Sequence, residues 1–349
     1  MTAAKNRLDV LRRFIELREH ADPELAARIE SHIAYLRALL GERTPLDEYM
    51  RATQGCTAAG WPREYVTHLG ETLRSRLDDL GIAWGESTLR DLLAAEGLIE
   101  ADAAPDAIRQ AAAEVEPAVR RLVDTDAPYR LNIEATDVQA YWAYWLDGSG
   151  ADLRLRLNLR HATFTKVTVR QFALHEVLGH GLKAASYTAR GTNQDVPWVR
   201  LLSVHSPHQI LLEGLAQTLP LFVTPDDDAV LTRVKLEHYS YLVRSELHLA
   251  INTGTSVEEC ADHARDRIPW WTDDAIGDAL TDRSADPLLR SYLWAYPAGQ
   301  DWFTHLSNTD PEVWRPILRA AYRSPLTTTD LVNLWPNGPT IGGRRNNLE

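Results

Sequence analysis

Cysteine is scarce in this chain: only Cys56 and Cys260 stand among 349 residues. Two cysteines so far apart supply neither a disulfide framework nor the close spacing of a cysteine metal site. Such usage is typical of a reducing compartment, and we expect a cytoplasmic protein.

Basic blocks and long hydrophobic runs are absent as well. The formal net charge is −12 at pH 7, which makes nucleic acid and anionic membranes poor partners. No apolar run approaches the length of a membrane span, and the first residues have no apolar signal core. No solenoid period is evident. The chain is long enough for a large core and for one or two domains.

Helical periodicity is what the first third of the chain does have. Apolar residues recur at the spacing of amphipathic helices in four segments: 5–40, 62–80, 87–99 and 105–124. No cluster of candidate catalytic or metal-binding residues occurs in 1–125. We therefore expect this part to be an N-terminal helical lobe that covers a second domain over 126–336. The Gly-, Asn- and Arg-rich tail over 337–349 is expected to be disordered.

The pattern then changes. Residues 129–134 are strand-like, and in 152–159 leucine alternates strictly with polar residues, as in a half-buried strand. Helical spacing returns over 231–251 and 286–305, and Pro297 is expected to kink or break the second of these helices. We therefore expect a mainly α protein of the α+β class with a small β-sheet.

The most informative stretch is 169–182, VRQFALHEVLGHGL, in which His175, Glu176 and His180 stand in an apolar helical run. Buried polar groups cost free energy unless they have partners, and one shared metal ion is the simplest partner for three. The histidines would be neutral ligands, and Glu176 the general base that deprotonates water. The plain alternative is two unrelated core histidines and a chance glutamate.

The two histidines are five residues apart, not four as in the common H-E-x-x-H motif. At about 100° per residue, four steps nearly close a helical turn, whereas five overshoot it by roughly 140°. Both can meet one ion if the helix contains an i→i+5 turn, a π-bulge. We expect Gly179 to absorb the insertion, because glycine is conformationally permissive.

A catalytic zinc needs a third protein ligand. Glu213 stands alone in the apolar helical run 211–217 and is the candidate; the alternative is that it caps or pairs at a helix end. The sequence thus predicts one zinc ion per chain, held by His175, His180 and Glu213.

These residues resemble those of known metallopeptidases. His175 to His180 matches the HExxGH pattern of dipeptidyl peptidase III and the HExxxH pattern of the microtubule-associated tyrosine carboxypeptidases and their bacterial relatives. Glu213-Gly214-Leu215-Ala216 resembles the EGLA motif that supplies the third ligand in the latter. The resemblance implies a thermolysin-clan (zincin-like) catalytic domain with a glutamate ligand, as in the gluzincins.

A poorly characterised bacterial family of helical proteins with HE and EGWA-type motifs is similar too. The counterparts of its later motifs are Arg244, Asn252-Thr253-Gly254 and the segment from Tyr292 to Gln300. In the thermolysin-like clan a strand before the HE helix pairs with extended substrate. That resemblance implies that Asn158 holds substrate; the alternative is an ordinary edge strand.

Further site candidates lie on the later helices. A donor must stabilise the oxyanion, and the sequence does not choose among Tyr239, Tyr241, His248, Tyr292 and Tyr296. Arg244 can bind both oxygens of a substrate carboxylate, or it belongs to a solvated helix face. Gln300, in the matched segment, is a further substrate-binding candidate.

The metal motif favours a zinc-dependent hydrolase acting on a peptide or small amide, and the resemblance implies a peptidase that is an exopeptidase, with a carboxypeptidase among the expected types. Two alternatives stay open. One is a metal-dependent biosynthetic enzyme, an amide hydrolase or lyase acting on a non-peptide small molecule. The other is a helical binding protein with a structural metal. The sequence gives neither the oligomeric state nor the peptide end that is read.

Overall fold

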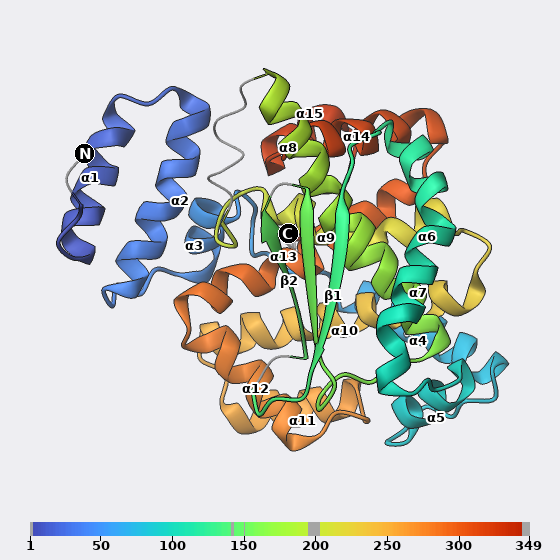
Figure 1. The fold of residues 1–349 in the computed structure, drawn as a ribbon. Coiled ribbons are helices and arrows are strands. Elements are labelled where there is room, and N and C mark those ends of the chain that lie inside the picture. The colour runs from blue at the N-terminus through green and yellow to red at the C-terminus, as the bar shows by residue number, and fades with distance from the viewer. Residues whose placement is uncertain (1–2, 141–142, 150, 195–202, 344–349) are drawn as a thin grey trace.

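The computed structural model describes residues 3–140, 143–149, 151–194 and 203–343. The chain is mainly helical, with one small sheet (Figure 1). Helices form in all four segments where the apolar spacing predicted them: α1 (Arg7–Glu19), α2 (Pro23–Leu39), α4 (Arg63–Asp79), α5 (Thr88–Glu96) and α6 (Ala104–Val123). One more helix, α3 (Leu46–Thr53), lies outside these segments. A short 3₁₀ turn, η1 (Ala101–Ala103), precedes α6.

The second part of the chain is helical after its three strands. It contains α7 (Lys166–Phe172), η2 (Ala173–Leu182), α8 (Lys183–Gln194), α9 (Gln209–Val223), α10 (Asp228–Thr253), α11 (Val257–Arg267), α12 (Asp273–Ser284), α13 (Pro287–Ser307), α14 (Pro311–Arg323) and α15 (Thr328–Leu334). Pro297 lies inside α13, which continues past it. Of the two predicted effects, a kink or a break, the break is therefore wrong; the extensive packing of α13 along α9 can offset the roughly 3 kcal/mol cost of an interior proline.

The sheet has the strand order β1-β3-β2, with β1 (Arg130–Thr136) parallel and β2 (Tyr144–Ser149) antiparallel to β3 (Asp152–Asn158). Leu153, Leu155 and Leu157 are buried, so the predicted half-buried strand is confirmed. It occupies the centre of the sheet, however, and the alternative of an ordinary edge strand is wrong. The two edge strands are β1 and β2.

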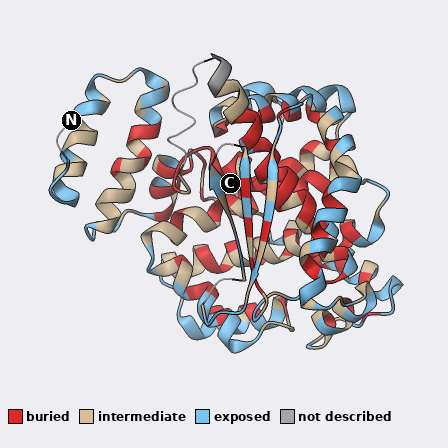
Figure 2. Ribbon diagram, viewed as in Figure 1, coloured by how far each residue is buried: buried red, intermediate tan, exposed pale blue. Residues whose placement is uncertain are grey.

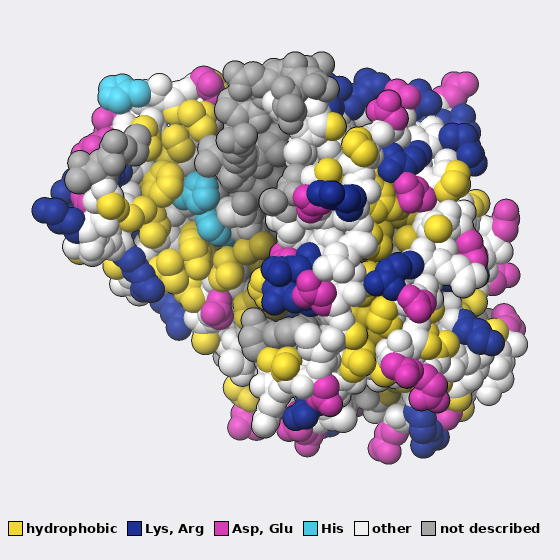
Figure 3. Space-filling view, in the orientation of Figure 1, with side chains coloured by type: hydrophobic (Ala, Val, Ile, Leu, Met, Phe, Trp, Pro, Cys, Tyr) yellow, Lys and Arg dark blue, Asp and Glu magenta, His cyan; other side chains and the backbone are white. Residues whose placement is uncertain are grey.

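Buried residues concentrate in the central helices, η2, α9 and α13 among them (Figure 2). The largest apolar cluster joins residues from both parts of the chain, for example Met50, Ile108, Leu174 and Trp302. The hairpin of α1 and α2 extends to one side (Figure 1), and α1 has no buried residue. Apolar side chains gather over this side of the molecule, whereas charges of both signs are interspersed elsewhere on the same face (Figure 3).

The start of the C-terminal tail is ordered. Gly343 forms a parallel bridge with Gly60, and Ile341 is buried in the main apolar cluster. The expected disorder is therefore wrong for 337–343, because backbone pairing with a distant loop leaves no local pattern in the sequence; 344–349 lie outside the described residues. Within the described part of the chain, no helix combines the length and apolar character needed to cross a membrane.

Candidate metal centre

His175 and His180 lie on a π-helix. The segment Ala173–Leu182 (η2) has the i→i+5 winding and joins α7 to α8 without a break. One turn therefore separates the two histidines, and their Nε2 atoms lie 3.2 Å apart. The predicted i→i+5 turn is confirmed, and it extends over 10 residues instead of a single bulge.

Gly179 lies where the π-helix touches α9. A Cβ built on it would be 2.9 Å from the carbonyl oxygen of Leu174 and 3.0 Å from the Cα of Ala216. Its φ is not in the left-handed region, so conformational freedom is not the reason for glycine here, contrary to our expectation. The reason is space, because a side chain does not fit at this approach of the two helices.

Glu176 forms a cluster of candidate ligands with the two histidines. One ligand atom from each of His175, Glu176 and His180 lies within 4.8 Å of the others. The Nε2 atom of His175 is 3.6 Å from Oε1 of Glu176. Because all three residues belong to one helical segment, the local winding alone brings them together.

Glu213 reaches the same place from α9. Its Oε2 atom is 3.5 Å from Nε2 of His180 and is buried without a hydrogen-bond partner in the described structure. Its Oε1 atom accepts hydrogen bonds from the hydroxyl of Tyr292 at 2.8 Å and from Nε2 of Gln209 at 2.9 Å. A buried carboxylate oxygen without a partner is costly, and a cation beside the histidines would supply one. The residues present thus fit a metal held by two imidazoles and a carboxylate.

Burial sets the protonation of this cluster. It lowers the pKa of His175 to about 3, with His180 adding to the effect, so the imidazole is neutral and keeps a lone pair for a cation. Burial likewise raises the pKa of Glu176 to about 7. Burial would also raise the pKa of Glu213, but attraction to His180 and His175 outweighs it and holds that pKa below its usual range. The two glutamates therefore differ: Glu213 stays anionic, and Glu176 can exchange a proton near neutral pH.

Lys183 is a buried cation beside this cluster. Its side chain is 1 % exposed, and Nζ donates a hydrogen bond to the carbonyl oxygen of Leu212 at 3.1 Å. Burial lowers the pKa of Lys183 to about 7, although Glu213 opposes the shift. The contact ties the start of α8 to α9 immediately before Glu213.

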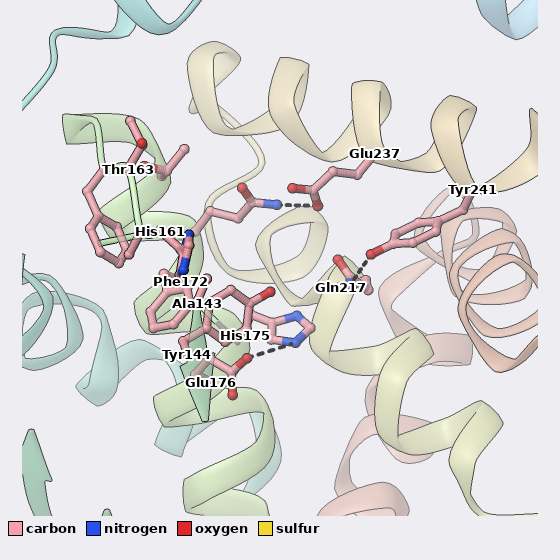
Figure 4. A pocket seen from close by; sticks show the side chains of 14 residues that line it. Ala143, Tyr144, His161, Thr163, Phe172, His175, Glu176, Gln217, Glu237 and Tyr241 are labelled. Atoms are coloured by element: carbon pink, nitrogen blue, oxygen red, sulfur yellow. Dashed lines mark hydrogen bonds and ion pairs between the residues drawn. The ribbon is translucent and has the colours of Figure 1, made fainter. Parts of the chain in front are cut away.

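A pocket of about 360 Å³ opens on the His175 and Glu176 side of the cluster. Side chains from α10 and α9 face those of the HE segment across it (Figure 4). Its lining includes the polar residues Tyr144, His161, Thr163, Thr168, Gln171, His175, Glu176, Gln217, Glu237 and Tyr241. A volume of this size suits a small ligand or a short segment of a larger one.

A second pocket, of about 290 Å³, opens on the side of His180 and Lys183. The edge strand β2 contributes to both pockets, with Tyr144 in the first and Leu146 in the second. The candidate ligands thus lie between two hollows that share one strand.

Tyr292 and Tyr296, predicted as catalytic, come together on α13. Tyr292 reaches Oε1 of Glu213, and its hydroxyl is 2.5 Å from that of Tyr296. Both therefore act on the cluster through Glu213. Tyr241 lines the first pocket and accepts a long hydrogen bond, 3.4 Å, from Nε2 of Gln217.

The predicted substrate contacts Asn158 and Gln300 are held inside the protein. Asn158 is fully buried, and its Nδ2 donates to the carbonyl oxygen of Val138 at 2.9 Å. Gln300 is fully buried and donates to the carbonyl oxygen of Val234 at 3.1 Å. Neither lines the two pockets at the cluster, so the geometry assigns both to holding backbone segments.

Three other candidates on α10 lie away from those pockets. Tyr239 donates to the carbonyl oxygen of Arg267 at 3.0 Å, on another face of the helix. His248 is buried edge-on against Trp294, with 5.5 Å between ring centroids. The Arg244 guanidinium lies 4.9 Å from the ring centroid of Trp271 and 5.5 Å from that of Tyr241.

Sequence reasoning missed Glu237, Gln171 and His161 in the first pocket. Glu237 stands one helical turn before Tyr241 on α10, so extending the helix face backward from Tyr241 would have found it. Gln171 stands four residues before His175 in the same helical run, so the same reasoning would have found it. His161 carries no such signal, because it lies in the turn after β3.

Comparisons with known proteins reach the fold only. No family model matches the chain, and no curated protein matches it. Among solved structures, the chain is similar to "the putative lipoprotein from Colwellia psychrerythraea", with a TM-score of 0.57 and 13% sequence identity over 91% of this chain. The matched region is 56% of that protein's chain, so the present chain spans little more than half its length.

Proposed function

We propose that the protein is a zinc-dependent peptidase of the thermolysin-like clan. The observation that carries the proposal is the unpartnered Oε2 atom of Glu213 beside the converging Nε2 atoms of His175 and His180. Two imidazoles and a carboxylate are a common ligand set of catalytic zinc, which keeps one position open. When bound there, zinc would lower the pKa of water and polarise an amide carbonyl.

Glu176 is the general base of this proposal. It lines the pocket, and burial raises its pKa to about 7, so its carboxylate can take a proton from the attacking water and later hand it to the leaving amine. Glu176 belongs to the same cluster, 3.6 Å from Nε2 of His175; in this proposal Glu213 is the carboxylate ligand and Glu176 is the base.

Neighbouring residues orient the site. Tyr292 and Gln209 donate hydrogen bonds to Oε1 of Glu213, and Oε2 lies beside Nε2 of His180. Hydrogen bonds of this kind orient metal ligands. Of the five candidate oxyanion donors, Tyr241 lines the pocket, and we assign it that role. Strand β2, at one edge of the described sheet and beside both pockets, suits an extended backbone.

The first test is metal analysis of the purified chain with a peptide panel. We expect about one zinc ion per chain and cleavage of short peptides. Glu176→Gln should keep the metal and lose activity by at least about 10²-fold, while the exposed control Glu71→Gln should leave both unchanged. Absence of bound metal would overturn the proposal. Cleavage of small amides but of no peptide would support the biosynthetic alternative, and full turnover by Glu176→Gln would remove Glu176 from its role.

A further inference from the structure

Glu237 directs a carboxylate into the same pocket as His175 and Glu176 (Figure 4). Its Oε2 atom accepts a hydrogen bond from Nε2 of Gln171 at 2.5 Å. Among the described residues, no basic side chain lies within 4.0 Å of this carboxylate. Gln171 orients the group but leaves its negative charge without an ion-pair partner.

The basic residues around Glu237 are engaged elsewhere. Arg233, one turn earlier on α10, makes two hydrogen bonds to Glu96, at 2.9 and 2.6 Å. Arg244 lies over the rings of Trp271 and Tyr241. Each attracts the carboxylate from a distance, yet burial still raises the pKa of Glu237, to about 7. The surroundings of the Glu237 carboxylate therefore supply too little positive charge to keep its pKa at the usual value.

The lining of the pocket has the same polarity. It includes two carboxylates, Glu176 and Glu237, and neither lysine nor arginine among its described residues. The pocket on the other side of the metal group contains Lys183 and His180. A cation at the metal group would neutralise the charges of Glu176 and Glu213. Glu237 contributes none of the candidate ligand atoms, so its charge would stay unpaired.

We propose that Glu237 binds an ammonium group of the substrate and thereby fixes which part of it enters this pocket. The inference rests on the proposed peptidase function and deepens it. An ammonium group would give the carboxylate the charge-assisted hydrogen bonds that it lacks. The two chemical sources are the free amino end of a peptide and a lysine side chain.

The size and setting of the pocket favour the amino end. About 360 Å³ holds a short terminal segment, and the same volume brings an ammonium group at Glu237 near the scissile bond at His175 and Glu176. The carboxyl side of the substrate would then extend along β2 toward the pocket of Lys183. On this basis the enzyme is an aminopeptidase, not a carboxypeptidase.

The test compares three peptides of the same length in the metal-loaded protein. They are a free alanine-based peptide, its N-acetylated form, and an N-acetylated form with lysine in place of the first alanine. We expect cleavage of the free peptide with a kcat/KM about 10- to 100-fold above that of the acetylated one. If the acetylated lysine peptide is cleaved and the free alanine-based peptide is not, the lysine side chain is the source of the ammonium group.

Binding is measured in parallel by calorimetry with Glu176→Gln as the background, since it should retain metal without turnover. Adding Glu237→Gln should weaken binding of the free peptide about 10- to 100-fold and leave the acetylated peptide unaffected; adding the exposed Glu71→Gln should change neither. Equal cleavage of free and acetylated peptides by the unmodified protein would refute the role of Glu237 while leaving the peptidase function standing. Failure to bind metal or cleave any peptide would instead remove the function itself.

Discussion

Gly214 of α9 and Gly299 of α13 are in direct backbone contact: a Cβ built on Gly214 would lie 2.5 Å from the Cα of Gly299. Gly214 directly follows Glu213, and α13 carries Tyr292, which donates to Glu213 at 2.8 Å. The approach of the two helices therefore sets the reach of Tyr292 to the candidate ligand.

Gly214→Ala tests this contact. Because neither backbone can yield without separating α9 from α13, we expect a loss of unfolding free energy of about 1–3 kcal/mol and weaker metal binding. Urea denaturation and chelator competition measure the two effects. The matched control is Gly277→Ala on α12, where the new methyl group meets nothing within 4 Å; it should be neutral or slightly stabilising. Equal behaviour of the two variants would contradict the packing argument.

Tyr292→Phe tests the orientation of Glu213. Loss of the hydroxyl removes one of the two hydrogen bonds to Oε1, and we expect metal affinity to fall about 10- to 100-fold. Tyr296→Phe should have a smaller effect, because that hydroxyl contacts Tyr292 and not Glu213. Competition with a zinc-sensitive dye gives both affinities. If the two variants bind equally well, Tyr292 does not support the ligand.

The pH dependence of substrate binding tests Glu237. Burial raises its pKa to about 7, with Arg233 and Arg244 opposing the shift and Glu96 adding to it. An ammonium group binds the ionised carboxylate, so affinity for a free-amine peptide should rise as pH increases through about 7 and fall again once the peptide's own amino group loses its proton at about pH 8. Calorimetry in the Glu176→Gln background removes the titration of Glu176 itself. Glu237→Gln should flatten the profile, and an unchanged profile would exclude Glu237 as its origin.

Asp301 allows a test of protein stability at a place away from the metal group. This buried carboxylate accepts hydrogen bonds from Trp61 and Tyr65, both at 2.7 Å, and lies 3.2 Å from Nε2 of His238. Burial would raise its pKa, but His238, His305 and Tyr65 outweigh this and hold the pKa below its usual value.

The folded pKa of Asp301 is thus lower than the unfolded one. Its stabilising contribution is present above about pH 4 and is lost as pH falls toward the folded pKa. We expect Asp301→Asn to lower the unfolding free energy at pH 7 by about 1–3 kcal/mol and to weaken the dependence on acid below pH 4. Denaturant titrations at several pH values measure it. Asp106→Asn, on a side chain 90% exposed, should change neither.

The sequence predicts best where a local pattern carries the information. Strict alternation located β3, and the five-residue spacing of His175 and His180 required the i→i+5 winding that η2 shows. Glu213 was found because a lone carboxylate in an apolar helix needs a partner, and the structure places it at His180.

What the sequence does not show depends on distant segments. The pairing of Gly343 with Gly60 and the central place of β3 have no local signature. Pro297 marks a break only for an isolated helix, whereas packing on α9 keeps α13 continuous. Asn158 and Gln300 were predicted as substrate contacts from the resemblance to known metallopeptidases; the backbone carbonyl groups to which they donate lie far away in the sequence, so no local pattern shows these hydrogen bonds.

The winding of η2 also determines how the next helix faces. Five residues in the i→i+5 winding cover about the same rotation as four residues in an α-helix, so η2 takes up the extra residue within its own turns. The helix beyond it keeps its contacts: Tyr187 on α8 donates to the carbonyl oxygen of Ala321 at 2.5 Å, and the hydroxyl of Ser186 lies 2.7 Å from that of Thr125. Deleting Gly179 would preserve these contacts only if the winding changed from i→i+5 to i→i+4 as well, so motif length and winding have to change together within this fold.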